Sequence, residues 1–146
     1  MAVSPGPAVR QAWSPARIYL VASGVFLLVT STAGFMINRT FPIGAEEFRS
    51  AESHHVFGVL ETNGWHNLLG VIGALLALGF AIRPQWSRFG ALFKGWIYVG
   101  VTAAVAIWSG DTFWVASNDA DQVVHATLAV GGLITGFLTP RSRPKL

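Results

Sequence analysis

Four long apolar segments account for most of the chain. The first, residues 18–37, runs for twenty residues without a charged side chain, and the others cover residues 64–82, 89–110 and 120–139. At 1.5 Å per residue, a helix of about twenty residues crosses a hydrocarbon core of about 30 Å. The sequence therefore predicts an all-α fold, a bundle of four transmembrane helices that forms one membrane domain over residues 18–139.

The composition is that of an integral membrane protein. Of the 146 residues, 52% are hydrophobic and 12% are charged, whereas charged residues make up about 25% of ordinary soluble domains. The net charge is +3, but the ten basic residues are scattered between apolar segments and form no basic stripe, so no nucleic-acid partner is expected. The absence of cysteine excludes disulfides, cysteine-ligated metal sites and covalent haem attachment.

Tails and loops join the apolar segments. Residues 1–17 hold three prolines and several small residues, so we expect a loose cytoplasmic tail, and residues 140–146 form a basic tail. Residues 38–62 form a polar outer loop. Its middle, residues 45–60, is interpreted as an interfacial helix with apolar side chains against the membrane surface, namely Phe48, Val56, Val59 and Leu60.

The third apolar segment follows a short basic turn over residues 84–88. Pro84 cannot continue the backbone hydrogen bonds of a helix, so the second segment ends at Arg83 and Pro84. Lys94 then lies about one turn into the third helix. Its four-carbon stem can reach the headgroups from that depth, which favours an anchor over a buried functional ammonium.

Charge placement predicts the orientation. One side of a four-span arrangement holds eight basic residues, which are Arg10, Arg17, Arg83, Arg88, Lys94, Arg141, Arg143 and Lys145. The other side holds Arg39, Arg49 and all seven acidic residues. The positive-inside rule then places both termini in the cytoplasm and the protein in the cell (inner) membrane. A cleaved signal peptide is the alternative for the first segment, but secretory apolar regions usually run for only about 7–15 residues.

Small residues mark one face of the second helix and one of the fourth. Gly70, Gly73 and Ala74 lie on the first face, and Ala129, Gly132 and Gly136 lie on the other. Membrane helices associate through close packing at such residues, so we expect these two helices to pack directly against each other. Packing within one chain is favoured over a homodimer interface, and a homo-oligomer stays open as an alternative.

A polar cluster stands at the outer ends of the same two helices. Asn63, His66 and Asn67 share a face of the second helix, and Asp121 and His125 share a face of the fourth. The two helices run in the same direction, so the histidines enter the membrane at a similar depth and should approach each other. Asp121 could accept a hydrogen bond from His125 and fix its tautomer.

Three interpretations of this cluster stay open. In the favoured one it is structural, because Asn63, Asn118 and Asp121 suit helix N-termini and the histidines would pair across the bundle. In the second, His66, His125 and Asp121 hold a metal ion, to which His54 and His55 could add ligands. In the third, His66 and His125 hold haem b, which their shallow position disfavours because haem needs a deeper apolar slot.

The motifs resemble those of an uncharacterised family of small four-span membrane proteins common in actinobacteria, a domain of unknown function. The resemblance rests on residues 57–59, 63–67 and 96–98 and on the pair Asn118 and Asp121 with His125, and it covers roughly residues 17–139. The family pattern often continues with a second histidine one turn after His66, where this chain has Gly70. The resemblance implies the fold and the membrane location, and it supplies no activity.

Together these features lead us to expect a non-enzymatic membrane protein, an accessory or interaction subunit, in preference to an enzyme. No nucleophile-base pair, phosphate-binding loop or zinc-protease helix is found in the sequence. The expected partners are the lipid bilayer and a larger membrane protein complex. The alternative is a redox or transport component that binds a metal ion or haem through His66 and His125.

Overall fold

The computed structural model describes residues 13–108 and 114–141. Within these residues there are four long helices, one short helix and one two-stranded hairpin: α1 (Pro15–Ile37), α2 (Ala45–Ser50), β1 (His55–Val56), β2 (Leu60–Glu61), α3 (Gly64–Ile82), α4 (Pro84–Trp108) and α5 (Asp119–Leu138). The long helices are α1, α3, α4 and α5, and all four are long and apolar enough to cross a membrane. The predicted all-α bundle of four spans is therefore confirmed, and most of the two expected tails lies outside the described residues.

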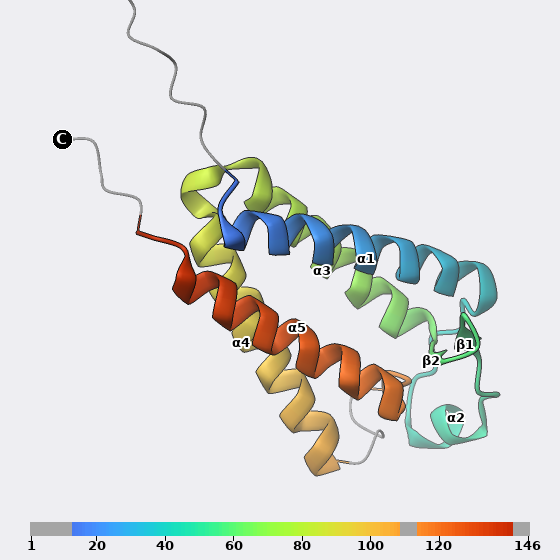
Figure 1. Cartoon of the computed structure of the whole chain (residues 1–146). Coiled ribbons are helices and arrows are strands. Elements are labelled where there is room, and N and C mark those ends of the chain that lie inside the picture. Colours follow the sequence, from blue (N-terminus) through green and yellow to red (C-terminus); the bar gives the residue numbers. More distant parts are fainter. Residues whose placement is uncertain (1–12, 109–113, 142–146) are drawn as a thin grey trace, which may run out of the picture.

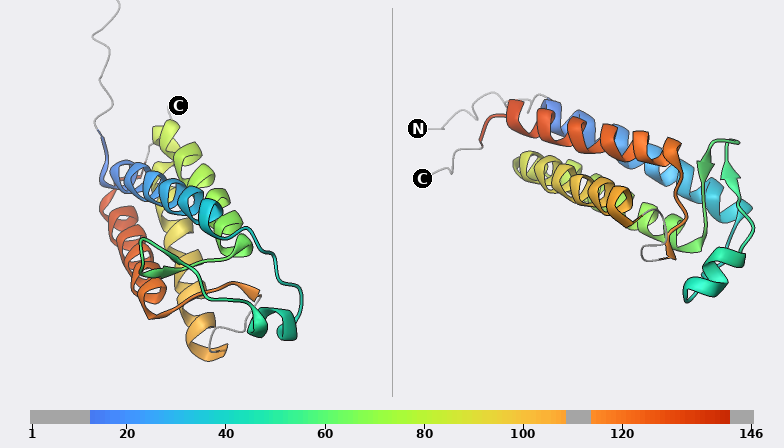
Figure 2. Two further views of the ribbon diagram at one scale, coloured as in Figure 1. Left: turned by 90° about the vertical axis from the view of Figure 1, so that its right-hand side faces the viewer. Right: turned by 90° about the horizontal axis from the view of Figure 1, so that it is seen from below.

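The long helices are arranged as two antiparallel pairs. α1 packs along α3, and α5 packs along α4 (Figure 1). The pairs come together near the connection between α3 and α4 and splay apart toward the hairpin (Figure 2). We call the first end, which carries Ser14, Arg83 and Thr139, the turn end, and the other the hairpin end.

Small residues produce the close approach within each pair, but the pairing differs from the prediction. Gly70 of α3 lies against Ser31 of α1, so closely that an added Cβ would overlap its Oγ. On α5, a Cβ at Gly132 would lie 2.8 Å from both Ala91 O and Gly95 Cα of α4. The small faces of α3 and α5 thus pack on α1 and α4, and the prediction that they pack on each other was wrong.

Hydrogen bonds join the helices at the turn end. Ala16 N donates to Thr139 Oγ1 at 3.0 Å, which ties the start of α1 to the end of α5. Arg17 Nε donates to Ala81 O at 3.0 Å, which ties α1 to the end of α3. Ser14 Oγ, which also caps α1, lies 3.3 Å from Ser87 Oγ of α4. All four long helices are therefore linked at this end.

The connection between α3 and α4 is shorter than predicted. α4 begins at Pro84 rather than at Phe89, so the basic turn expected over residues 84–88 is the first part of the helix. Proline is well suited to the first helical position, because the N–H that it lacks has no partner there. Arg83 alone links the two helices, and Lys94 lies ten residues into α4 instead of one turn.

The outer loop contains a hairpin where a longer interfacial helix was predicted. α2 ends at Ser50, and the pairs His55–Glu61 and Val56–Leu60 form the antiparallel ladder. The turn places Phe57 and Gly58 at positive φ, +54° and +72°, and Val59 N donates to Val56 O at 3.1 Å. These angles match a hairpin turn of type I′ and end any helix through this stretch.

A glycine substitution tests the contact between α4 and α5. Gly132→Ala should destabilise the protein by about 1–3 kcal/mol, because the new methyl group meets the α4 backbone, which cannot move aside. Unfolding titrated with SDS in mixed micelles measures the change. Gly79→Ala is the matched control, since a Cβ there meets nothing within 4 Å. Equal effects of the two substitutions would contradict the packing described.

Candidate functional site

His66 and His125 meet at the hairpin end, as their spacing predicted. Their ring centroids are 6.0 Å apart and the planes are inclined by 52°. His66 comes from the first turn of α3 and His125 from the second turn of α5. Both Nδ1 atoms are buried and have no hydrogen-bond partner in the part of the chain that the structure describes. The two rings are therefore close enough for a water molecule or an ion to bridge them.

Asp121 is bonded to the backbone and not to His125. Its Oδ2 accepts the backbone N–H of Asn118 and that of Glu61, both at 3.0 Å. The first bond completes a capping box at the start of α5, where a negative charge also interacts favourably with the helix dipole. The second bond fixes strand β2 to α5. Asp121 is 2% exposed, and the suggested bond from His125 is not formed.

Asn63 joins two segments at the start of α3. Its Oδ1 accepts the His66 N–H at 2.9 Å, which caps the helix. Its Nδ2 donates to Trp114 O at 2.7 Å, a residue held at φ +56° just before α5. The side chain thus orients the helix that carries His66 and ties it to the segment that leads to His125.

Asn67 is buried between α1 and α3. Its Oδ1 accepts the Thr62 hydroxyl at 2.6 Å, and its Nδ2 donates to Asn38 O at 3.1 Å. Gly34 of α1 makes room for this amide, because a Cβ there would overlap the Asn67 side chain. Asn67 therefore holds the end of α1 and the end of the hairpin against α3.

Asn38 belongs to the same network, although sequence reasoning gave it no role. Its Nδ2 donates to Thr62 O at 3.0 Å, and its Oδ1 accepts the Thr40 N–H and hydroxyl. The available signal was its position directly after the first apolar segment, where a polar side chain can satisfy groups at the helix end. Asn38 is 6% exposed.

The other candidate metal ligands do not join the histidine pair. His54 Nδ1 lies 2.9 Å from Glu52 O within the loop, and His55 is exposed on β1. Across residues 13–108 and 114–141, no group of three or more His, Cys, Asp or Glu side chains is placed to hold a metal ion. Gly70 stands where the second histidine of the family pattern would be, and its contact with Ser31 leaves no room for a side chain.

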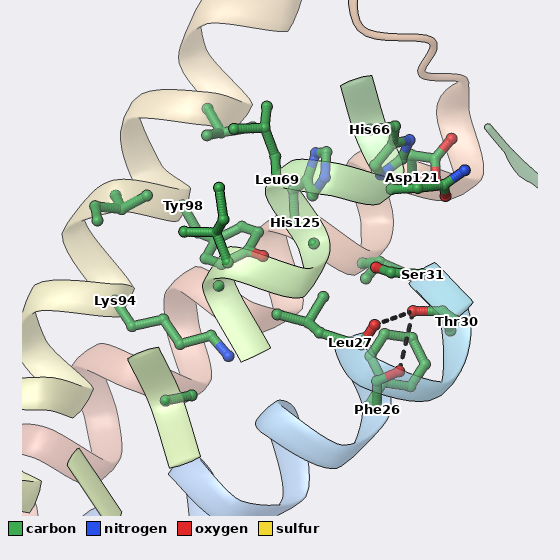
Figure 3. A pocket seen from close by; sticks show the side chains of 18 of the residues that line it. Phe26, Leu27, Thr30, Ser31, His66, Leu69, Lys94, Tyr98, Asp121 and His125 are labelled. Atoms are coloured by element: carbon green, nitrogen blue, oxygen red, sulfur yellow. Dashed lines mark hydrogen bonds between the residues drawn. The ribbon is translucent and has the colours of Figure 1, made fainter. Parts of the chain in front are cut away.

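A cavity of about 320 Å³ extends from this cluster into the bundle (Figure 3). Side chains from α1, α3, α4, α5 and the hairpin line it. His66, Asp121 and His125 lie toward one end, and Tyr98 and Lys94 of α4 lie deeper. Tyr98, whose ring centroid is 5.5 Å from that of His125, was part of the motif that carries the family resemblance but had been assigned no role.

Lys94 is not the surface anchor that the sequence suggested. The residue is 6% exposed, and its Nζ donates to Ser23 Oγ on α1 at 2.7 Å. The snorkelling prediction assumed a helix that begins at Phe89. Because α4 begins at Pro84, Lys94 lies about 15 Å along the helix, and its ammonium is bonded to α1 inside the bundle instead of extending to the surface.

The model of one protein family, described as a domain of unknown function (DUF4383), matches residues 10–138. The chain therefore belongs to the DUF4383 family, in agreement with the resemblance of its motifs to a domain of unknown function. No curated protein and no solved structure matches the chain. The family and the four apolar helices identify an integral membrane protein with several spans.

Substitution of Asp121 tests the link between the hairpin and α5. Asp121→Ala removes the acceptor of two backbone N–H groups, so we expect a loss of about 2–4 kcal/mol in unfolding free energy. SDS-induced unfolding measures it. Asp119→Ala is the matched control, an exposed carboxylate in the same helical turn, which should cost less than about 1 kcal/mol. Similar losses for both variants would show that Asp121 does not stabilise the contact between the hairpin and α5.

Proposed function

We propose that this member of the DUF4383 family is a non-enzymatic accessory or interaction protein of the cell (inner) membrane, with a structural polar cluster at its outer face. The observation that supports this role is the bonding of Asp121. An acid-base or ligand-binding carboxylate presents its oxygens to a substrate or an ion, whereas Oδ2 of Asp121 is occupied by two backbone N–H groups. Asn63 and Asn67 are likewise bonded to neighbouring segments.

The proposed orientation has the turn end and both termini in the cytoplasm. Its support is the charge distribution. With the buried Lys94 set aside, the described part of the turn end carries Arg17, Arg83, Arg88 and Arg141, and the sequences of the two tails add three more basic residues. The hairpin end holds Arg39, Arg49 and all the acidic residues that the structure describes. Short cytoplasmic loops carry an excess of Lys and Arg, so this split favours the turn end as the inner one.

Cysteine labelling tests this orientation. Ser50→Cys, at an exposed position at the end of α2, should react with a membrane-impermeant thiol reagent added to intact cells. Ser142→Cys should react only after the membrane has been permeabilised. The native chain has no cysteine, so the unsubstituted protein supplies the background. Labelling of Ser142→Cys in intact cells, with Ser50→Cys protected, would reverse the topology.

The accessory role predicts a stable complex in the native membrane. Membranes from the source cells are solubilised in a mild detergent, and the size of the particle that contains the chain is measured by native electrophoresis. We expect it to be larger than the particle formed by the purified chain alone in the same detergent. Identical migration of the two would count against an accessory subunit and would leave a protein that acts alone.

A second candidate function is a redox or transport component that binds a metal ion or haem b. Its support is the 6.0 Å approach of His66 and His125 with both Nδ1 atoms buried and unpaired. Elemental mass spectrometry and visible absorption of the purified protein separate the two candidates. The structural role predicts neither a stoichiometric metal nor a Soret band. About one metal or haem per chain, lost in His66→Ala and His125→Ala and kept in His55→Ala, would support the second candidate instead.

A further inference from the structure

Lys94 is a cation buried deep in a membrane bundle. Its side chain points into the interior (Figure 3), and its Nζ donates to the Ser23 hydroxyl of α1. The rings of Tyr19 and Tyr98 flank it, with their centroids 5.6 and 5.8 Å from Nζ. Charged side chains inside a membrane are unfavourable unless paired, and they are by default candidates for functional sites.

The charge of Lys94 is not neutralised by the described part of the chain. An ammonium has three N–H donors, and Ser23 Oγ is the only hydrogen-bond acceptor that residues 13–108 and 114–141 provide. None of the described carboxylates forms an ion pair with it. Asp121 lies at the other end of the cavity, and its Oδ2 already accepts two backbone N–H groups. An anion brought by a ligand would pair with the free N–H groups.

The cavity beside Lys94 opens toward the lipid. Several of its apolar wall residues are also exposed on the surface, among them Leu69, Ile72 and Leu76 of α3 and Phe93 and Ile97 of α4. α3 and α4 splay apart along this side (Figure 1). The volume of about 320 Å³ is near the lower end of the range of small-molecule sites, roughly 300–1,000 Å³. A molecule dissolved in the bilayer can therefore enter from the side.

We propose that this cavity binds a long-chain fatty acid, with its carboxylate paired to the Lys94 ammonium and its hydrocarbon chain along the apolar wall. Charge complementarity selects the acid, because a neutral lipid of the same length would leave the ammonium without a counter-ion. The small volume favours one hydrocarbon chain over the two of a phospholipid. The proposal goes beyond the accessory role and does not depend on it.

Binding of palmitic acid and of hexadecanol to the purified full-length chain in non-ionic detergent tests the proposal. Native mass spectrometry gives the stoichiometry, and calorimetric titration gives the affinities. We expect one palmitate per chain, with hexadecanol at least about ten-fold weaker, since only the acid pairs with the ammonium. Equal affinities for palmitic acid and hexadecanol would overturn the proposal. A neutral lipid found in the cavity by native mass spectrometry that prevents palmitate from binding would overturn it too.

Two pairs of variants assign the binding to the cavity. Lys94→Met keeps a long apolar side chain and should abolish the preference for the acid, whereas Arg83→Met, at an exposed cation, should retain it. An unchanged preference in Lys94→Met would overturn the proposal.

A second substitution decides the matter if Lys94→Met fails to fold. A Cβ at Gly73 would lie 3.4 Å from Leu27 Cδ1 and 3.8 Å from Tyr98 Oη, which is ordinary contact. Gly73 lines the cavity, so the longer side chain of Gly73→Leu should take up part of its volume. It should weaken palmitate binding by at least about ten-fold, since it takes the volume of the ligand. Gly79→Leu, which meets open space, is the control. Unchanged binding in Gly73→Leu would contradict the proposed site.

Discussion

A polar group that leaves water as this chain enters a bilayer must find its partner within the protein, because lipid tails offer none. The hairpin end is organised by this constraint. Asn38, Asn63, Asn67 and Asp121 are each no more than 6% exposed, and each forms at least two hydrogen bonds to another segment or to a helix end. These hydrogen bonds join the polar loop to the ends of α1, α3 and α5, and the histidine pair lies between them.

The spans and their caps were predictable because both depend on local sequence. An apolar segment of about twenty residues identifies a span whatever surrounds it, and Asn63 and Asn118 cap α3 and α5 as their positions before those segments indicated. The approach of His66 to His125 also followed, because helical spacing and direction place both rings near one end of the bundle.

Three features depended on the neighbours of a segment and could not be predicted. Small residues occur on several helices, so the partner of the α3 face was decided by Gly24 and Ser31 of α1, which the sequence does not distinguish from other small residues. The hairpin depends on positive φ at Phe57, a conformation that is rare for an aromatic residue. The depth of Lys94 was misjudged because Pro84 begins a helix as readily as it ends one.

Lys94 differs from the amide and carboxylate side chains of the hairpin end. Asn63, Asn67 and Asp121 are bonded to other segments of the same chain, whereas among the described residues the ammonium has one hydroxyl acceptor and two aromatic rings. The cavity therefore extends from a polar end, where the Nδ1 atoms of the two histidines are unpaired, to an ammonium that has no carboxylate partner among the described residues. This contrast separates a structural role for the cluster from a binding role for the deeper part of the cavity.

Amide hydrogen exchange of the unsubstituted protein in micelles, measured by NMR, tests most directly whether Asp121 fastens the hairpin to α5. The N–H groups of Glu61 and Asn118 both donate to Asp121 Oδ2. We expect these two amides to exchange as slowly as those in the middle of α5, even though both flank loops. Exchange as fast as that of Gly58, at the open tip of the hairpin, would contradict it.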